Sequence, residues 1–233
     1  MADRRRPGGA TPRAGQPRIV DLTRPITHEM LNFPGEPRPG FVRFGDLGDL
    51  GFRCHQVLMP THFGTHADAP SHFLAAGRPI DRMPPTAYVG SAVLVDVRRR
   101  PDPARITRDD LARAWPGGPP VRRAVVRTGW AERVTGARYF RGFPGLTREA
   151  ARWLVRQKRL ALLGLDLPSV HPTDYSRVHR ILFQGGVAVV EGLVRLAEVR
   201  ASRFFLVALP LPLRGLDGSP VRALAIVGDP AAL

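Results

Sequence analysis

The chain has 233 residues, of which 43% are hydrophobic, so it is long enough and apolar enough to bury the core of one globular domain. It contains no run of about 18 apolar residues, and we therefore predict no membrane-spanning helix. The formal net charge of +15 comes almost entirely from scattered arginines, and aromatic residues make up only 7% of the chain. This pattern argues against a nucleic-acid-binding surface, because stacking platforms need aromatic residues among the basic ones.

Residues 1–17 consist largely of Arg, Gly, Pro and Ala without periodicity, which predicts a disordered basic arm. We expect residues 18–233 to form a single domain. The start of the chain lacks the apolar stretch of a secretory signal, and Cys54 is the only cysteine. Both features favour the reducing cytoplasm.

The part of the chain that follows the arm is rich in Pro and Gly and predicts short antiparallel strands and loops. Farther along, short apolar runs with many β-branched residues predict strands that are covered on both faces. These runs are 92–97, 124–128, 160–165, 187–190, 204–209 and 223–227.

Three helices are expected among these strands. Thr107 begins a capping box for a helix that runs toward Trp115, and Thr147 can cap a second helix with one apolar face. A third helix is expected to start near Thr173 and to end at the glycine pair 185–186. The alternation of strands and helices predicts parallel pairing in the second half of the chain. The class is therefore α/β or α+β with a mixed sheet.

Three of the seven histidines, His62, His66 and His72, lie within eleven residues, together with Asp68. Imidazole and carboxylate groups are the ligands expected of a zinc, manganese or iron site that contains no cysteine. The glycine and proline in this segment indicate a loop after a strand, in which Gly64 allows a tight turn and Asp68 shares a side with His66. A core loop with incidental histidines is the alternative, but four ligand-type residues around such a turn favour a metal site.

A second cluster of candidate residues, His171, Asp174, His179 and Glu191, lies far downstream. Glu191 follows the apolar run 187–190, and the carboxyl ends of strands are where α/β sheets place their sites. His179, on the preceding helix, can reach the same point. Glu191 could instead be a surface residue, although its apolar flanks indicate burial.

Motifs for rival chemistries are absent from the sequence. There is no Gly-x-Ser-x-Gly elbow, His-Glu-x-x-His pair, phosphate loop or Cys-x-x-Cys pair. Cys54 beside His55 suggests a thiol nucleophile, but no partner that would orient such a pair can be placed.

The segment 62–73 resembles the His-x-Gly-Thr-His-x-Asp-x-Pro-x-His signature of the cyclase family, which includes bacterial kynurenine formamidases and isatin hydrolases. The resemblance extends over about residues 18–228. It implies an α/β fold with a small barrel-like mixed sheet, the swivelling β/β/α-type cyclase fold. It also implies a homo-oligomer, either a dimer or a tetramer. The other blocks that carry it are 19–23, 33–36, 126–130, 163–166, 189–193, 209–211 and 218–223.

The resemblance also implies a site that holds one or two divalent ions per chain, with zinc or manganese favoured. Asp68 and Glu191 would be shared between the ions, and His72 would be the catalytic acid/base. The metal ligands carried over from the family are His62, His66, Asp68, His179 and Glu191.

The chain departs from the family pattern at two places. Phe33-Pro34-Gly35-Glu36 stands where bacterial kynurenine formamidases usually have Trp-Pro-Gly-Asp. Phe33 is carried over as a substrate-binding residue, and the change leaves the exact substrate open. His171 stands where an acid is common in the family, so it could alter the pocket rim or add a ligand.

The sequence therefore predicts a hydrolase that uses metal-activated water on a small cyclic or N-acyl amide, of the aryl formamide or lactam type. Its partner would be a small-molecule substrate, with no nucleic acid or membrane involved. A metal-dependent cyclase or dehydratase in a biosynthetic pathway is an alternative with the same centre. A catalytically silent binding or scaffold protein is the alternative of another class, and the complete ligand set argues against it.

Overall fold

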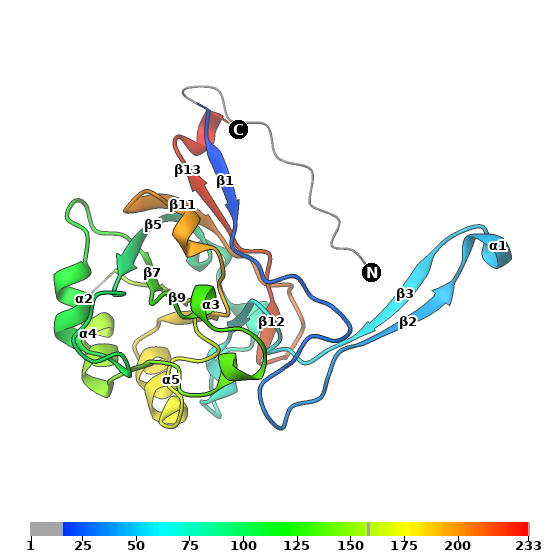
Figure 1. Cartoon of the computed structure of the whole chain (residues 1–233), viewed down its shortest axis with the longest axis horizontal. Helices are drawn as coiled ribbons and strands as arrows, with labels where there is room; N and C mark the ends of the chain where they lie inside the picture. Colours follow the sequence, from blue (N-terminus) through cyan, green and yellow to red (C-terminus); the bar gives the residue numbers. More distant parts are fainter. Residues whose placement is uncertain (1–15, 158, 233) are drawn as a thin grey trace.

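The computed structural model describes residues 16–157 and 159–232, so most of the predicted arm over 1–17 lies outside the described residues. Within these residues, nine strands form one strongly curled mixed sheet that resembles half a barrel (Figure 1). The predicted α/β class with a barrel-like mixed sheet is confirmed. The order of strands across the sheet is β1 (Arg18–Asp21), β13 (Leu224–Val227), β11 (Arg203–Val207), β5 (Val89–Asp96), β7 (Arg123–Arg127), β9 (Leu162–Leu165), β10 (Ala188–Glu191), β4 (His66–Asp68) and β12 (Gly218–Pro220).

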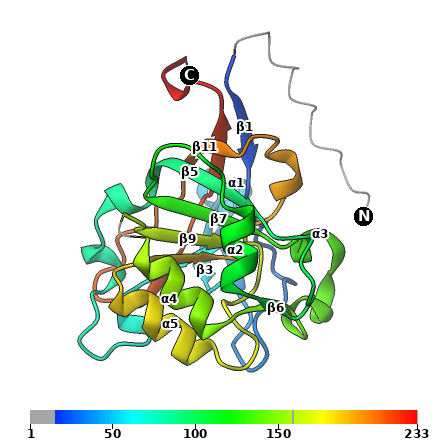
Figure 2. The same ribbon diagram turned by 90° about the vertical axis from the view of Figure 1, so that its left-hand side faces the viewer.

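Three helices cover one face of the sheet (Figure 2). They are α2 (Arg108–Ala114), α4 (Arg148–Arg156) and α5 (Tyr175–Gln184). The Thr107 capping box is confirmed, because Thr107 accepts from the backbone of Asp110 and the Asp110 carboxylate accepts from Thr107 N–H. Thr147 likewise caps α4. The third predicted helix, α5, begins two residues later than expected, at Tyr175.

Both faces of the central strands are buried, which explains their continuous apolar sequences. In β5, Val93 and Val95 pack beneath the helices, whereas Ala92 and Leu94 face the concave side of the sheet. The concave side is filled mainly by apolar residues from the other strands and from the loops that close the half-barrel.

The prediction of parallel pairing holds only for part of the second half. β5, β7, β9 and β10 are parallel neighbours. β11 pairs antiparallel with both β5 and β13, so the prediction is wrong there. The reason is that β11 and β13 are joined only by loops and the short strand β12 (Gly218–Pro220), without the long helical crossover that parallel neighbours need.

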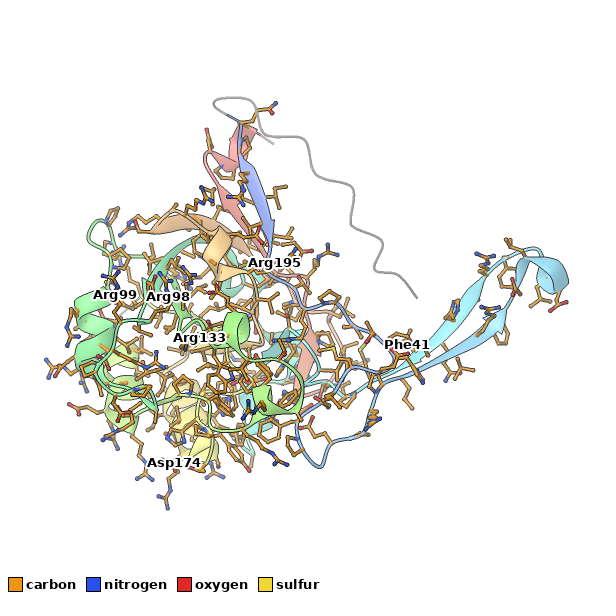
Figure 3. All side chains as sticks on the ribbon, viewed as in Figure 1. Phe41, Arg98, Arg99, Arg133, Asp174 and Arg195 are labelled. Atoms are coloured by element: carbon orange, nitrogen blue, oxygen red, sulfur yellow. The ribbon has the colours of Figure 1, made fainter. Side chains whose placement is uncertain are left out.

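A two-stranded hairpin projects from this body (Figures 1 and 3). From here on, "the arm" means this hairpin and not the basic segment 1–17. It comprises β2 (Gly40–Gly45), a short helix α1 (Leu47–Leu50) and β3 (Cys54–Leu58). Every residue of β3 is exposed. The sequence indicated short antiparallel strands in this half but not a hairpin free of the body.

The remaining elements are small. β6 (Arg105–Ile106) and β8 (Gly145–Leu146) form a two-residue parallel pair, and α3 (Trp130–Arg133) follows β7. Among the described residues, no helix is long and apolar enough to cross a membrane.

Candidate metal centre

The two parts of the chain that carry the candidate ligands meet because β4 pairs antiparallel with β10. In this register Glu191 lies opposite His66, and Val189 lies opposite Asp68. Residues directly opposed on antiparallel strands have Cβ atoms about 4.5–5.5 Å apart. His179, on α5, reaches the same point although it is 111 positions from Asp68 in the sequence. Strand pairing therefore assembles one cluster from both segments.

The segment His66–Asp68 is a strand, β4, and not the loop that the sequence predicted. The interpretation as a loop was wrong there because β4 gains hydrogen-bonded neighbours on both sides, β10 and β12, which local sequence does not reveal. His62 does lie in a loop after a strand. Gly64 turns that loop with a φ of 64°.

Close backbone contacts fix the Gly64 turn against the end of β10. The Thr65 hydroxyl donates to the carbonyl oxygen of Gly192 at 2.8 Å and accepts from the backbone N–H of Arg24 at 2.9 Å. Gly192 itself has a φ of 71°, and a Cβ placed on it would overlap the carbonyl oxygen of Gly64. Only glycine therefore fits at position 192.

We expect Gly192→Ala to lower the free energy of unfolding by about 3 kcal/mol, from a left-handed backbone that costs roughly 1–2 kcal/mol and from the overlap with Gly64. Gly186→Ala is the matched control, because Gly186 has a φ of 76° but open space around its Cβ position. It should lose only the backbone contribution of about 1–2 kcal/mol. Denaturant unfolding measures both, and equal losses would contradict the close approach of the two segments.

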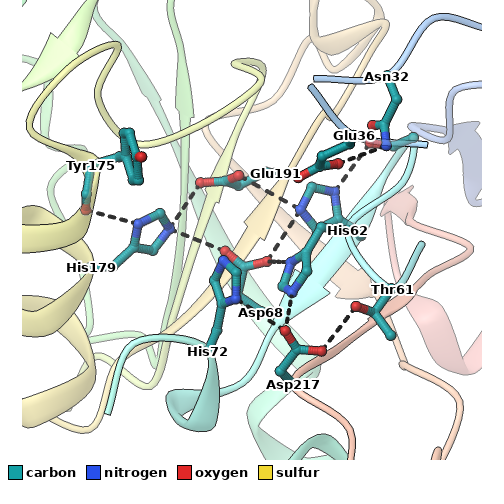
Figure 4. Close-up of polar contacts among 12 residues, drawn as sticks. Asn32, Glu36, Thr61, His62, Asp68, His72, Tyr175, His179, Glu191 and Asp217 are labelled. Carbon is teal, nitrogen blue, oxygen red and sulfur yellow. Dashed lines mark hydrogen bonds and ion pairs between the residues drawn. The ribbon is translucent and has the colours of Figure 1, made fainter. Parts of the chain in front are cut away.

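Asp68 links two clusters of ligand-type side chains through its two oxygens, the first around His62 and the second around His179 (Figure 4). Its Oδ1 lies 2.8 Å from His62 Nδ1 and 3.2 Å from His66 Nε2. Its Oδ2 lies 3.1 Å from His179 Nε2. Glu191 spans the same two clusters, with Oε1 at 3.2 Å from His179 Nε2 and Oε2 at 3.7 Å from His66 Nε2. Each carboxylate thus places one oxygen in each cluster.

The imidazoles of His62, His66 and His179 each make a second contact, through the ring nitrogen that faces away from Asp68 and Glu191. Such outer contacts fix the tautomer and the orientation of histidines that bind metals. The contacts are His66 Nδ1 to the carbonyl oxygen of Gly64 (3.3 Å), His179 Nδ1 to the carbonyl oxygen of Tyr175 (2.9 Å) and His62 Nε2 to Asp217 Oδ2 (3.0 Å).

Asp217 is a site residue that the sequence reasoning missed. Besides His62, its carboxylate contacts His72 Nδ1 at 3.1 Å and accepts from the Thr61 hydroxyl at 2.9 Å. The backbone N–H of Ala69 donates to its carbonyl oxygen at 2.8 Å, which anchors its turn beside the histidine segment. The signal that could have found it is an acid directly before the family block at 218–223.

His72 lies beside this centre with one ring nitrogen oriented by Asp217. Its ring stacks on that of His62 with 3.8 Å between centroids. Its side chain is partly exposed, unlike those of His66 and His179, which are nearly buried. His72 is therefore accessible from the cavity that the centre faces.

Buried negative charge dominates the electrostatics of the cluster. Burial lowers the pKa of the imidazoles, but the neighbouring carboxylates outweigh it and raise the pKa of His62 to about 10 and that of His179 to about 9. Burial disfavours the charged form of Asp68, yet His62 and His66 hold the pKa of that carboxyl well below its usual range. The carboxylates therefore favour positive charge at the centre of the donor set, and either protons or divalent cations can supply it.

The donor set fits a divalent metal by type and by distance. Two sets of three ligand atoms, each within 4.8 Å of one another, share Asp68. The first contains His62 and His66, and the second contains His179 and Glu191. A third set joins His62 and His72 to Asp217.

The centre opens into a cavity of about 520 Å³. Phe33, which the sequence singled out, lines this cavity and meets Phe140 edge to face at 6.0 Å. Phe73 forms another part of the wall. The cavity therefore combines a polar floor with aromatic walls, as small-molecule sites commonly do.

Two members of the downstream cluster do not join the centre. His171 Nδ1 accepts from the backbone N–H groups of Thr173 and Asp174, and the Asp174 carboxylate accepts from Arg148. Both therefore serve to shape the start of α5. Among the described residues, His171 belongs to none of the three ligand sets and does not line the cavity.

The chain is similar to known proteins over most of its length. The family model described as "Putative cyclase" matches residues 20–172. A kynurenine formamidase of Geobacillus thermodenitrificans (strain NG80-2) is 32% identical over 208 residues, which cover 88% of this chain and 95% of that relative.

Solved structures show the same fold. Isatin hydrolase A from Labrenzia aggregata, solved with benzyl benzoate bound, has a TM-score of 0.82 and 27% identity over 93% of this chain and 96% of that one. A structure from Bacillus stearothermophilus, described as a predicted metal-dependent hydrolase, has a TM-score of 0.74 and 27% identity over 90% of this chain and 98% of that one. The chain belongs to the cyclase family.

Proposed function

We propose that this protein is a metal-dependent hydrolase that cleaves the C–N bond of a small cyclic or N-acyl amide, of the aryl formamide or lactam type. The relatives named kynurenine formamidase and isatin hydrolase support this reaction class. One observation carries the proposal: Asp68 and Glu191 each place one oxygen near His66 and the other near His179. Carboxylates in that position suit a pair of cations.

We assign the metal ligands accordingly and propose up to two divalent ions, with zinc or manganese favoured by the imidazole and carboxylate donors. Asp68 and Glu191 would be shared, and His179 would belong to one side of the centre. The ligands on the other side would be His62 and His66.

When bound, the metal supplies a water nucleophile at neutral pH and polarises the scissile carbonyl. As the water oxygen bonds to the carbonyl carbon, His72 Nε2 takes up the proton that the water loses, and when the C–N bond breaks it delivers that proton to the departing nitrogen. Asp217 accepts from His72 Nδ1 and so leaves Nε2 to face the cavity. Phe33 and Phe73 in the cavity wall would hold an aryl ring and exclude bulk water.

Asp217→Asn should lower kcat/KM by about 10–100-fold, as is usual for residues that hold the outer nitrogen of a catalytic or metal-bound histidine. Both histidines contact Oδ2 of the carboxylate, and the Thr61 hydroxyl donates to Oδ1. The amide is uncharged and replaces one of these oxygens with an NH2 donor, so it cannot accept from all three groups. Thermal unfolding should change little, because the Asp217 side chain is 41% exposed. Steady-state kinetics test this, and unchanged kinetics would remove Asp217 from the site.

The function is tested by elemental analysis of the purified protein combined with a hydrolysis screen of formyl-anilides, lactams and lactones. We expect one or two equivalents of metal, and turnover that a chelator abolishes and added metal restores. Ring closure or loss of water from an added substrate would instead support a cyclase or dehydratase. A protein without metal affinity or turnover would contradict the proposal and favour a scaffold.

We further propose that the chain forms a homo-oligomer, a dimer or tetramer, in which the arm contacts a second copy. Two-stranded hairpins are at best marginally stable alone in water. Apolar side chains on the arm are nonetheless exposed, including Phe44 at 70% and Leu58 at 70%. Figure 3 shows the arm standing clear of the body from Phe41 outward. Burial of these side chains would supply the association energy.

Phe44→Asp is therefore expected to weaken self-association by at least about 100-fold, from the lost apolar burial and the charge placed in the interface. Ile19→Asp is the matched control, since Ile19 is an apolar residue 50% exposed on β1, away from the arm. Light scattering across a concentration series measures both variants. A monomeric parent chain, or equal effects of the two substitutions, would contradict a role for the arm.

We also propose that residues 18–233 form one domain and that the protein works in the cytoplasm. The first strand of the chain, β1, pairs with the last, β13. The beginning and the end of this segment therefore belong to the same sheet, as expected for one domain. A single cysteine, Cys54, suits a reducing compartment. Limited proteolysis and cell fractionation test the two statements.

A further inference from the structure

Arg24 lies in the wall of the cavity and pairs with no carboxylate of residues 16–157 and 159–232. Arg24 lines the cavity, and its terminal nitrogen Nη2 is buried yet has no hydrogen-bond partner among the described residues. A buried N–H group of a guanidinium that lacks an acceptor costs more free energy than a neutral one. Such a group is a strong reason to look for a ligand that supplies the acceptor.

Arg24 is held firmly at both ends. Its backbone N–H donates to the Thr65 hydroxyl, which in turn donates to Gly192, so its position is tied to both metal-centre segments. Its guanidinium carbon lies 4.3 Å from the centroid of the Tyr139 ring, in cation–π contact. The guanidinium is therefore presented to the cavity at little cost in side-chain entropy.

The acids around the cavity are already engaged with other groups. Asp68 and Glu191 contact the histidines of the centre, and Glu36 accepts from the Asn32 amide at 2.6 Å. Asp166, next to the Tyr139 loop, accepts from the backbone and hydroxyl of Thr128. No ion pair joins any of these carboxylates to Arg24 within the described residues, and its guanidinium contacts the neutral side chain of Tyr139. An anionic ligand can therefore supply the acceptor that Nη2 lacks.

We propose that Arg24 is a specificity residue that binds an anionic group of the substrate, and that the amide cleaved here carries a carboxylate. This inference rests on the proposed function, because it places the carboxylate in the same cavity as the scissile amide. A guanidinium binds a carboxylate through paired N–H groups, which fixes orientation as well as charge. Arg24 would thereby position the amide group of the substrate next to the metal centre.

The test compares 2-formamidobenzoate with formanilide, which differ only in the carboxylate. We expect the parent chain to prefer the carboxylate substrate in kcat/KM. Arg24→Gln should reduce the ratio of the two kcat/KM values by about 10–100-fold, the range for one charge-assisted hydrogen-bonded contact. Arg24→Lys keeps the charge but not the paired donors and should retain part of the preference.

Arg138→Gln is the matched control, because Arg138 is an exposed arginine beside Tyr139 that does not line the cavity. It removes the same charge from the same segment and should leave the substrate ratio unchanged. Equal changes in the Arg24 and Arg138 variants would overturn the proposal, since long-range charge would then explain the preference. A parent chain with no preference for the carboxylate substrate would overturn it as well.

Binding gives a readout that does not depend on turnover. Calorimetric titration of the metal-loaded chain with 2-aminobenzoate and with aniline, at fixed salt, should show tighter binding of the carboxylate compound. Arg24→Gln should weaken that binding at least about tenfold, and Arg138→Gln should not. If neither formyl compound is hydrolysed, the proposed function fails while this titration still decides the role of Arg24. Unchanged 2-aminobenzoate binding in Arg24→Gln would refute it.

Discussion

Asp68→Ala is expected to leave the purified protein with little bound metal and to lower kcat/KM by at least about 10³-fold, because metal activation of water contributes several kcal/mol to the rate. Asp68 lies at the centre of the cluster and contacts His62, His66 and His179. Its removal takes away the carboxylate that contacts both halves of the donor set and would neutralise the charge of the bound cations. Elemental analysis and steady-state kinetics on the same preparation measure the two effects.

Asp109→Ala serves as the control, because this substitution removes the same charge from an exposed acid at the start of α2. It should retain the metal and the activity of the parent chain. Asp68→Ala protein that folds and keeps its full metal content would show that the centre lies elsewhere.

His72→Ala should keep the metal but lose about 10²–10⁴-fold in kcat, the usual contribution of a positioned general acid. Asp217 orients the His72 ring, and the partial exposure of that ring lets it face substrate. Added imidazole should restore part of the activity, because a small base can enter the space that the side chain leaves. Metal content and kcat are measured on the same samples.

A stoichiometric loss of metal in His72→Ala would contradict this role. His72 would then be a ligand together with His62 and Asp217, whose atoms also lie within metal-binding reach of one another. The two outcomes are therefore distinguished by one elemental analysis.

Much of the helix-covered part of the fold follows from local sequence. The capping residues Thr107 and Thr147 mark the helix starts correctly, because a side-chain oxygen satisfies backbone N–H groups within its own turn. The buried strands are apparent because both of their faces are apolar. Such features depend on neighbours in the chain and are visible without a structure.

Features that depend on distant partners were not visible. The segment His66–Asp68 becomes a strand only because β10 and β12 flank it. The arm lacks a burial pattern because no residue that the structure describes covers β3. Strand direction at β11 follows from the path of the chain across the sheet, which local periodicity does not encode.

The candidate site divides in the same way. The spacing of His62, His66 and Asp68 pointed to a metal, and the family resemblance tied them to His179 and Glu191. Asp217 escaped notice because a single acid in a glycine-containing turn has no local signature of a role. Its place beside His62 and His72 arises from pairing of β12 with β4.

The central claim is that strand pairing brings His179 and Glu191 to the same cation as Asp68. Anomalous diffraction from crystals of the zinc- or manganese-loaded protein tests it most directly. We predict a metal peak with His179 Nε2 and oxygens of Asp68 and Glu191 at about 2.0–2.2 Å. An ordered metal bound elsewhere, with His179 and Glu191 remote from it, would contradict the assignment.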